Sequence, residues 1–531
     1  MLFLFFLSYN ESSTPRSITI LLSFALFLNN VLYIVLYIEY IEKMDRDYIH
    51  SLEADRWLFH ADLLVDKAHV VMLEERGIIR VDEAAAILKC LQNIQLQPEV
   101  FIERELPDYE DVHTAIESIV MREIGDNTGG RMHTARSRND EVATCIRIAL
   151  REELLRLMKK LNELRRALIE RAAENIETVM PGYTHLQHAQ PTTLAHHFLA
   201  HADAFARDFA RLIAAYEHVN VSPLGAAAFA ATGFPIDRER TAELLGFDSV
   251  LENSMDAVST RDFVIEAVSC YANLMTNLSR LAEEIILWGS SEFDFIILPE
   301  EYATGSSIMP QKRNPDYAEL VRARAGSVYG CLLSILSICK ALPYSYNRDL
   351  QEVTPHLLRA TEISLASVAV MRGYVTKLEL KKERMAYEAK IGFTTATELA
   401  DTIVRETGLP FRTAYRIVAS MAKEHEHGET NIADAAPIRI DEFSVRIIGK
   451  RVSELGLTPD SVKEALDIVS NINRRIVTGG PARKEVMRML RARVEDLNRD
   501  DKLREAKEER VKLCLMELEQ EVEKRIQTSH N

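Results

Sequence analysis

The sequence is poor in cysteine and glycine, and both shortages narrow the class of protein. Only six of the 531 residues are cysteine, no two form a CxxC pair, and none is paired with histidine at the spacing of a zinc site. This excludes a disulfide scaffold, and we expect reduced cysteines in the core of a cytoplasmic protein. The 20 glycines are few for this length. With the long stretches rich in Leu, Ala, Glu and Arg, they favour helix over sheet.

An excess of basic residues is also missing. The chain has 64 Lys and Arg against 80 Asp and Glu, a formal net charge of -16. Nucleic-acid binding favours basic faces, so we expect no nucleic-acid partner. A small anionic substrate stays compatible with this charge, because a local cluster of Arg and Lys can sit in an acidic protein. The length exceeds one compact core and predicts roughly two to four units.

Residues 1–43 differ from the rest of the chain. Residues 18–38 are almost wholly apolar and about long enough to cross a bilayer, although Asn29 and Asn30 interrupt the run. Few basic residues flank it, and no small-residue cleavage site follows. Two interpretations stay open: a membrane anchor, or a start codon assigned upstream of a true start near Met44. A membrane partner follows only from the first.

Apolar periodicity predicts an all-α fold. From residue 51 apolar side chains recur every three or four positions up to Gly77, and Asp82 is a plausible N-cap for a second helix that ends near residue 91. A third helix is predicted over residues 108–124. These helices indicate a small N-terminal domain over residues 44–131.

Longer helices are predicted for the middle of the chain, which we interpret as a central helix bundle over residues 132–378. A proline-free stretch runs from the polar residues near position 140 to Met180, and further helices are predicted over residues 193–220, 254–288 and 316–340. At about 1.5 Å per residue, such helices are longer than a small domain is wide. This length is typical of helix bundles.

Beyond residue 378 the predicted helices shorten and turn signals become frequent. We expect a small helical C-terminal domain over residues 379–486, in which Asp460 is an N-cap. Residues 487–531 are rich in charge, with apolar residues at heptad-like spacing. They predict a charged terminal helix, exposed or packed against a partner, without catalytic content.

Polar segments lie at the boundaries of the long helices. The first covers residues 133–140, where Arg136, Arg138 and Asn139 suit carboxylate recognition, because a guanidinium binds a carboxylate through two parallel hydrogen bonds. A helix N-cap with solvated arginines is the alternative. The fourth segment, residues 343–352, combines polar and aromatic groups that could bind the distal end of a substrate.

The second segment, residues 182–192, places His185 in a turn between two prolines. An imidazole titrates near neutrality and can donate or accept a proton at working pH. Other histidines lie close in sequence, so composition alone does not select one. His197 and His201 stand at i,i+4 and could bind zinc, but no third ligand stands out in the sequence. We therefore expect surface histidines and no metal site.

The third segment, residues 304–319, is predicted to be a loop, because Pro310 and Pro315 disfavour helix around its polar centre. It carries a pair of serine hydroxyls, the ammonium of Lys312 and the carboxamide of Asn314. Such groups can remove a proton from carbon and stabilise the negative charge that results. An ordinary polar connection between two helices is the alternative.

The four segments, in this order, resemble motifs of the argininosuccinate lyase family in the fumarase/aspartase superfamily. The matching strings are Ser-Arg-Asn-Asp, Tyr-Thr-His-Leu-Gln, Gly-Ser-Ser-x-Met-Pro-Gln-Lys-x-Asn-Pro-Asp and Tyr-Asn-x-Asp-Leu-Gln-Glu. Together they separate this family from its fumarase, aspartase and adenylosuccinate lyase relatives. The similarity covers about residues 45–485. The resemblance implies a carbon-nitrogen lyase that cleaves argininosuccinate to arginine and fumarate without a cofactor, as an all-α homotetramer whose active sites collect segments from three subunits.

The resemblance also implies roles for individual residues. Ser306 is the base that removes the carbon-bound proton, and His185 is the acid that protonates the departing nitrogen, with Glu319 orienting it. Lys312 and Asn314 stabilise the charged intermediate. The positions that match substrate-binding residues of the family are Ser51, Arg138, Asn139, Thr184, Tyr346 and Gln351.

The chain departs from the family pattern at two places. The apolar extension replaces the usual Gly-Gly-Arg-Phe arm, and Thr354 stands where many members have a binding lysine. Two other functional hypotheses stay open. One is a sister lyase that releases fumarate from adenylosuccinate, malate or aspartate. The other is a structural role, either like that of the lens crystallins related to this family or as a membrane-tethered scaffold.

Overall fold

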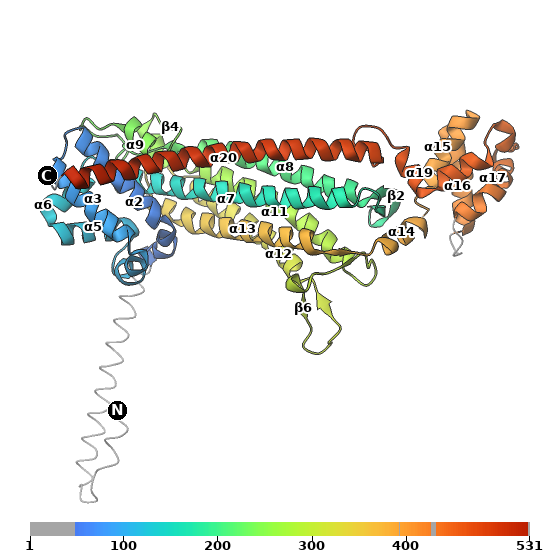
Figure 1. Ribbon diagram of the computed structural model, residues 1–531, viewed down its shortest axis with the longest axis horizontal. Coiled ribbons are helices and arrows are strands. Elements are labelled where there is room, and N and C mark those ends of the chain that lie inside the picture. Colours follow the sequence, from blue (N-terminus) through green and yellow to red (C-terminus); the bar gives the residue numbers. More distant parts are fainter. Residues whose placement is uncertain (1–47, 392, 426–431, 529–531) are drawn as a thin grey trace, which may run out of the picture.

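The computed structural model describes residues 48–391, 393–425 and 432–528. The apolar extension and its predicted anchor therefore lie outside the described residues. Within the described ranges, no helix is both long and apolar enough to span a bilayer. The described chain is elongated and predominantly helical, as the sequence predicts (Figure 1).

The centre of the molecule is a bundle of long helices that run side by side (Figure 1). They are α7 (Arg138–Glu174), α8 (Leu194–Val219), α11 (Asp262–Trp288), α12 (Asp316–Cys339) and α13 (Val353–Lys377). The longest, α7, has 37 residues and begins at a capping box formed by Ser137 and Asp140. Apolar residues on its inward faces are buried against α8 and α13, and this continuous core positions the helix ends.

Three details of the central prediction are wrong. The first long helix ends at Glu174 rather than Met180, because residues 179–193 form a hairpin. The helix predicted over 254–288 is divided into α10 (Ser254–Ser259) and α11, with extended backbone at Thr260. The prediction also missed α13, whose Pro355 is tolerated because it lies in the first turn.

The N-terminal helices cover one end of the bundle. They are α2 (Leu52–Glu75), α3 (Val81–Gln95), α4 (Pro98–Val100), the π-helical η3 (Phe101–Glu105), the 3₁₀ helix η4 (Leu106–Asp108), α5 (Val112–Ile124), α6 (Asp126–Gly129) and η5 (Gly130–His133). Asp82 is not an N-cap, since α3 begins at Val81 after Arg80. The third predicted helix starts late, at Val112, and the carboxylate of Asp111 caps it by accepting from the Thr114 N–H at 2.7 Å.

Short strands hold the loops at the helix ends. β1 (Val179–Thr184) and β2 (Gln187–Thr193) form an antiparallel hairpin, and the other pairs have two residues each. These are β3 (Val221–Ser222) with β4 (Ser249–Val250), β5 (Ile296–Ile297) with β8 (Glu379–Leu380), and β6 (Thr304–Gly305) with β7 (Arg313–Asn314). The remaining short helices of this part are α9 (Arg238–Leu244), η6 (Glu300–Tyr302) and η7 (Arg348–Glu352).

The C-terminal helices form a second core at the opposite end of the molecule (Figure 1). Its helices are α15 (Ala396–Thr407), α16 (Phe411–His425), α17 (Ile432–Ile448), η8 (Ser453–Leu455) and α18 (Pro459–Leu466). Outside this core, α14 (Lys382–Ile391) packs against β1, and α19 (Ile468–Asn473) contacts α18, β2 and α20. Asp460 is not an N-cap, because Thr458 accepts the Ser461 N–H and Pro459 opens α18. The domain limits drawn from the sequence stay predictions.

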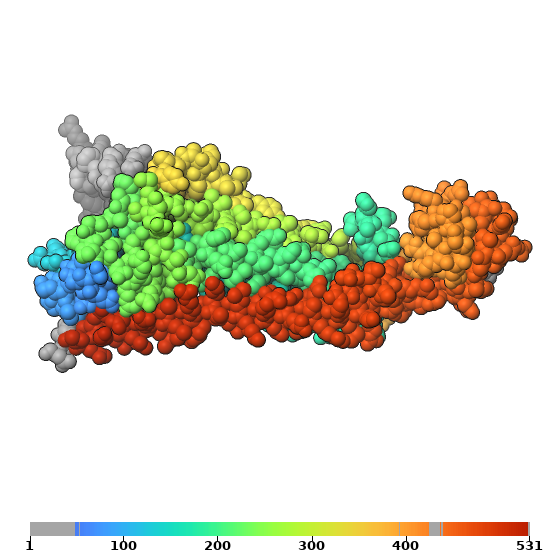
Figure 2. All heavy atoms as spheres, turned by 90° about the horizontal axis from the view of Figure 1, so that it is seen from above, coloured from blue at the N-terminus to red at the C-terminus, as the bar shows by residue number. Residues whose placement is uncertain are grey.

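The terminal helix α20 (Arg483–Thr528) has 46 residues and runs back along the whole bundle to the N-terminal helices (Figures 1 and 2). Apolar residues of α20 such as Leu497 and Leu518 are buried where the helix packs against the rest of the chain. At its far end, Arg525 pairs with Glu74 at 2.9 Å. The prediction of an exposed or partner-packed helix is therefore corrected: α20 packs along its own chain, which explains its heptad-like apolar spacing.

Candidate active site

A cleft of about 390 Å³ lies at the N-terminal end of the bundle. Five of the predicted substrate-binding residues line it together: Ser51, Arg138, Asn139, Tyr346 and Gln351. They come from the starts of α2 and α7 and from the segment around η7. The fold thus brings together side chains that are up to 300 positions apart in the sequence.

The two arginines near the start of α7 lie in different environments. Arg138 lines the cleft and donates to the carboxylate of Asp111 at 3.1 Å, with 40 % of its side chain exposed. Arg136 is fully buried and pairs with Asp66 and Glu141. Only Arg138 is therefore available to a bound carboxylate, whereas Arg136 belongs to the interior.

The backbone beside this start is held by Asp140, the last residue of the predicted motif. Its carboxylate accepts from the N–H groups of Gly225 and Ala227, both at 2.9 Å. Asn139 donates to the carbonyl of Ala228 at 3.0 Å. These bonds tie residues 225–228 to the end of α7, so the position of Asn139 depends on a loop that is distant in sequence.

Asp55, one turn into α2, is a cleft residue that the sequence reasoning missed. Its carboxylate accepts from the hydroxyl of Ser51 at 2.7 Å and from the N–H of Val112 at 3.2 Å. Burial raises the pKa of Asp55 to about 6. Asp55 thus orients Ser51 and places a titratable carboxyl at the wall of the cleft.

The η7 side of the cleft contains cations that were not predicted. Arg348 donates to the carbonyl of Ile49 at 2.8 Å and pairs with Glu110 at 2.5 Å. Arg261, at the start of α11, is buried, and burial lowers its pKa to about 10. Burial also raises the pKa of Tyr346, against the opposing effect of Arg261. Local sequence gave no signal for Arg261, because it lies outside the four motifs.

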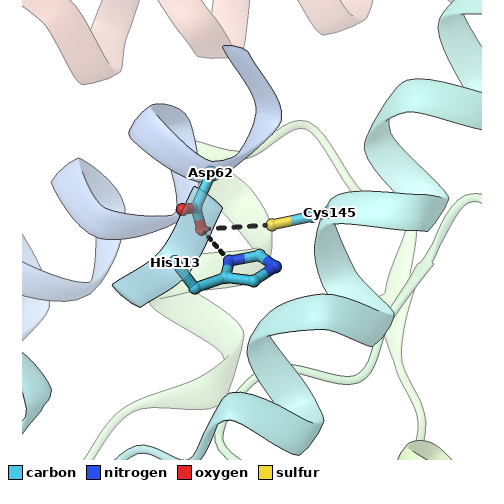
Figure 3. A group of neighbouring side chains, drawn as sticks. All are labelled: Asp62, His113 and Cys145. Carbon is cyan, nitrogen blue, oxygen red and sulfur yellow. Dashed lines mark hydrogen bonds and ion pairs between the residues drawn. The ribbon is translucent and has the colours of Figure 1, made fainter. Parts of the chain in front are cut away.

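A buried charged network lies beneath the cleft. His113 Nδ1 is 2.8 Å from Asp62 Oδ1, and the thiol of Cys145 donates to the same oxygen at 3.5 Å (Figure 3). Burial opposes a charge on His113, but the attraction of Asp62 outweighs it and raises the pKa of His113 to about 10. The carboxylates of this network therefore already face cations of the protein, His113 and Arg136.

His185 and Thr184 lie elsewhere, at the tip of the β1–β2 hairpin, which packs against α14. Figure 1 shows this hairpin at the end of the bundle opposite the N-terminal helices. Both side chains are exposed, and His185 has a φ of 56°. The left-handed backbone conformation makes a tight turn at the tip. The side chains of Thr184 and His185 are therefore presented to solvent and not to the cleft of the same chain.

The predicted catalytic loop projects from the side of the bundle between β6 and β7 (Figure 1). The Ser306 hydroxyl accepts from the N–H groups of Ile308 at 3.2 Å and Met309 at 3.0 Å. Lys312 and Glu319 are exposed, while Asn314 is half-buried in β7. The loop lies apart from both the cleft and the His185 hairpin, so one chain does not assemble the predicted site.

His197 and His201 are accompanied by a third ligand candidate, contrary to the sequence expectation. Glu284 on α11 lies between them, with its Oε2 2.6 Å from His197 Nε2 and 2.7 Å from His201 Nε2. The residue could not be found by spacing, because it lies more than 80 positions away on another helix.

Comparisons with known proteins show the enzyme superfamily to which this chain belongs. A family model described as Lyase matches residues 47–330. Among solved structures, EDDS lyase in complex with formate is 33% identical and superposes with a TM-score of 0.83, covering 92% of this chain and 95% of that one. A class II fumarase from Schistosoma mansoni, 16% identical with a TM-score of 0.65, shares the fold over 78% of this chain and 90% of its own. The chain is therefore a lyase of the fumarase/aspartase superfamily.

The closer relatives define the family. A model described as Argininosuccinate lyase C-terminal matches residues 393–473. The curated argininosuccinate lyase of Methanosarcina mazei is 54% identical over 85% of this chain and 90% of its own length, and that of Methanocaldococcus jannaschii is 44% identical over 86% and 92%. This protein belongs to the argininosuccinate lyase family, which confirms the resemblance found in the sequence.

Proposed function

We propose that this protein cleaves argininosuccinate reversibly to arginine and fumarate, a step of arginine biosynthesis, in the cytoplasm and without a cofactor. The observation that carries the proposal is the composition of the cleft, in a chain of this family. Arg138, Arg261 and Arg348 line it together with Asp55, Glu110, Asp111 and Glu117. Argininosuccinate carries carboxylates as well as a guanidinium group, so a cleft with both signs of charge complements it. The six free cysteines agree with a reducing compartment.

The reaction requires a base, and we assign this role to Ser306. A serine hydroxyl is a weak base, so the alkoxide form needs stabilisation. The N–H groups of Ile308 and Met309 already donate to its oxygen, and they would stabilise a negative charge there in the manner of an oxyanion hole. Lys312, six residues further along the loop, adds a positive charge on the same segment.

The remaining roles follow from the direction of the elimination. When the proton leaves carbon, negative charge develops on the adjacent carboxylate, and the ammonium of Lys312 and the amide of Asn314 stabilise it mainly in the transition state. His185 protonates the departing guanidino nitrogen, and Glu319 from a neighbouring chain orients its ring. Thr184 binds substrate beside His185. Thr354 lines the cleft, so a hydroxyl replaces the lysine of many members at that wall.

Assembly completes the site in this proposal. The cleft, the β1–β2 hairpin and the β6–β7 loop lie apart in one chain, and the latter two are exposed. The outer face of α12 also exposes large apolar residues along its length: Leu320, Tyr329, Leu333 and Leu336. An apolar stripe of this kind is typical of a protein interface. We propose that identical chains pack there as a homotetramer, so that three chains contribute to each site.

The direct test is to incubate the purified full chain with argininosuccinate and to follow fumarate by its ultraviolet absorbance. We expect fumarate and arginine in equal amounts from argininosuccinate. Adenylosuccinate, malate and aspartate serve as control substrates and should release none. Fumarate from a control substrate but not from argininosuccinate would establish a sister lyase, and no release from any substrate by the tetramer would favour the structural role.

A further inference from the structure

A second polar cluster lies on the surface of the bundle, outside the cleft and the proposed catalytic segments. His197 and His201 stand one turn apart on α8, and both direct their Nε2 atoms at the same oxygen of Glu284 on α11. The exposed fractions of the three side chains are 27%, 11% and 31%. Two imidazoles and one carboxylate thus converge on one point that solvent can reach.

We propose that His197, His201 and Glu284 form a binding site for a divalent transition-metal ion, with zinc as the best match. Imidazole nitrogen and carboxylate oxygen are the usual ligands of zinc other than thiolate, and three protein ligands leave a fourth position for water. The candidate donor atoms all lie within 4.8 Å of one another. None of the four motif strings found in the sequence includes these three residues.

The geometry requires only a small adjustment to admit the ion. Zinc holds nitrogen and oxygen ligands at about 2.0–2.2 Å, which places neighbouring tetrahedral donors about 3.3 Å apart. The observed separations from Glu284 Oε2 are 2.6 Å and 2.7 Å, so the donors need to part by less than about 1 Å. Rotation of the partly exposed Glu284 side chain supplies this movement while the helix backbones stay in place.

The surroundings restrict the two histidines to this arrangement. The ring of Trp288 packs edge-on against His197 at 5.0 Å between centroids, and the two imidazoles lie 5.5 Å apart. Because α8 and α11 are long helices packed on each other, the ligands are held on rigid elements. Preorganised donors bind a metal more tightly than donors on flexible loops, because less conformational entropy is lost.

The location suggests a stabilising role for the ion. The hairpin that carries His185 leads directly into α8, and Glu284 lies one turn before Trp288, the last residue of α11. The segment after α11 leads to the Ser306 loop. A metal at this point would link α8 and α11 near the ends at which they join the two exposed segments of the proposed reaction. We therefore expect it to raise resistance to unfolding rather than to take part in the chemistry.

Without an ion, Glu284 accepts two imidazole hydrogen bonds. Although burial opposes its charge, these bonds and the nearby histidines lower the pKa of Glu284 well below its usual range. A matched pair elsewhere on the surface, His218 with Glu266 at 2.7 Å, has a single imidazole and offers a control.

The test uses Co²⁺, whose visible absorption reports tetrahedral coordination, on the full-length protein in its native assembly. We expect one Co²⁺ per chain, displaced by Zn²⁺. His197→Asn, His201→Asn and Glu284→Gln should each weaken binding at least about tenfold, as loss of one of three ligands requires. The His218→Asn control should bind as the wild type does.

Thermal unfolding gives a second measurement. Zn²⁺ should raise the melting temperature of the wild type and of His218→Asn but not that of Glu284→Gln, which keeps a side chain of the same shape. Co²⁺ binding that survives in all three ligand variants, or a thiolate charge-transfer band that places the ion at a cysteine, would overturn the proposal. So would the absence of stoichiometric binding by the wild type.

Discussion

The cleft at the N-terminal end and the two segments that carry His185 and Ser306 differ in how they are held. The cleft rests on a buried network in which Arg136, His113 and several carboxylates are paired. The β1–β2 hairpin tip and the β6–β7 loop are exposed and contain only short strands. Most of the proposed substrate-binding residues are thus preorganised within one chain, whereas Thr184 and the proposed acid and base are presented outward.

In the proposed assembly, this difference would distribute the residues of each site over several copies of the chain. A buried polar network costs free energy unless every member is paired, so it can be maintained only inside a folded unit. The two exposed segments, for which we propose catalytic roles, avoid that cost in the isolated chain, and in the proposed assembly a neighbouring chain would cover them. The proposed tetramer would join these two kinds of structure at each site.

The largest expected effect is on catalysis. Ser306→Ala or His185→Asn should lower kcat for argininosuccinate cleavage by about 10²–10⁴-fold, the usual contribution of an acid or base. Both residues lie in exposed segments, so the melting temperature should stay near that of the wild type. Steady-state kinetics with fumarate detection measures the first quantity. Full activity in Ser306→Ala would remove the assignment of the base.

Co-expression of Ser306→Ala with His185→Asn tests whether different chains supply the base and the acid of one site. If different chains supply Ser306 and His185, mixed tetramers contain sites in which both are intact, about a quarter of all sites at random assembly. Activity should therefore reappear in the mixture, although each variant alone is inactive. If one chain supplied both residues, no intact site would form, and the mixture would stay inactive.

The next effect is on stability and concerns the buried side of the comparison. Arg136→Met leaves the carboxylates of Asp66 and Glu141 buried without their cation, which should lower the free energy of unfolding by about 3–5 kcal/mol. The matched control is Arg499→Met, because Arg499 pairs with Asp496 on the surface at 2.8 Å. An exposed pair of this kind contributes about 0–1 kcal/mol. Denaturant unfolding measures both free energies. If Arg136→Met and Arg499→Met lowered the free energy of unfolding equally, the buried network would not be more important for stability than a surface pair.

The smallest effect is the pH dependence contributed by Asp55. Its pKa is raised by burial from 3.8 to about 6, so ionisation penalises the folded state. The penalty is absent below pH 4, grows as the pH rises to about 6, and reaches about 3 kcal/mol above that. Asp55→Asn removes it and retains an oxygen for the bonds from Ser51 and Val112.

The melting temperature of Asp55→Asn, compared with that of the wild type, should therefore increase between pH 4 and pH 7. The difference between the two proteins is the relevant quantity, since other groups titrate in both. Parallel curves over this range would show that the carboxyl of Asp55 ionises in the folded protein as it does in the unfolded chain.

Much of the helical fold could be predicted from the sequence, because apolar periodicity and caps are local. The predicted limits of α8 and α12 agree with the structure to within one residue. The errors arose where local signals compete. Asp82 and Asp460 are good N-cap types but lie within the first turns of helices that begin earlier. The break at Thr260 has no proline or glycine to mark it, so the two helices looked continuous.

The candidate site was predictable only where residues belong to contiguous motifs. Five of the predicted substrate-binding residues do meet in the cleft, four of them from the motif strings. Arg261 and Asp55 were missed as site residues, because nothing in the adjacent sequence separates them from other charged residues. Glu284 was missed for the same reason. Residue spacing along one helix cannot reveal a cluster whose members lie on two helices.

The sequence by itself determined the helices and the family, because short-range periodicity and contiguous motifs carry that information. The tertiary structure alone decided which polar groups meet: it turns Arg138 toward the cleft and Arg136 into the interior, and it places Glu284 between two histidines. It also separates His185 from Ser306 in one chain. The reason is physical, since packing between distant segments fixes the direction and burial of each side chain, and both lie beyond what neighbouring residues specify.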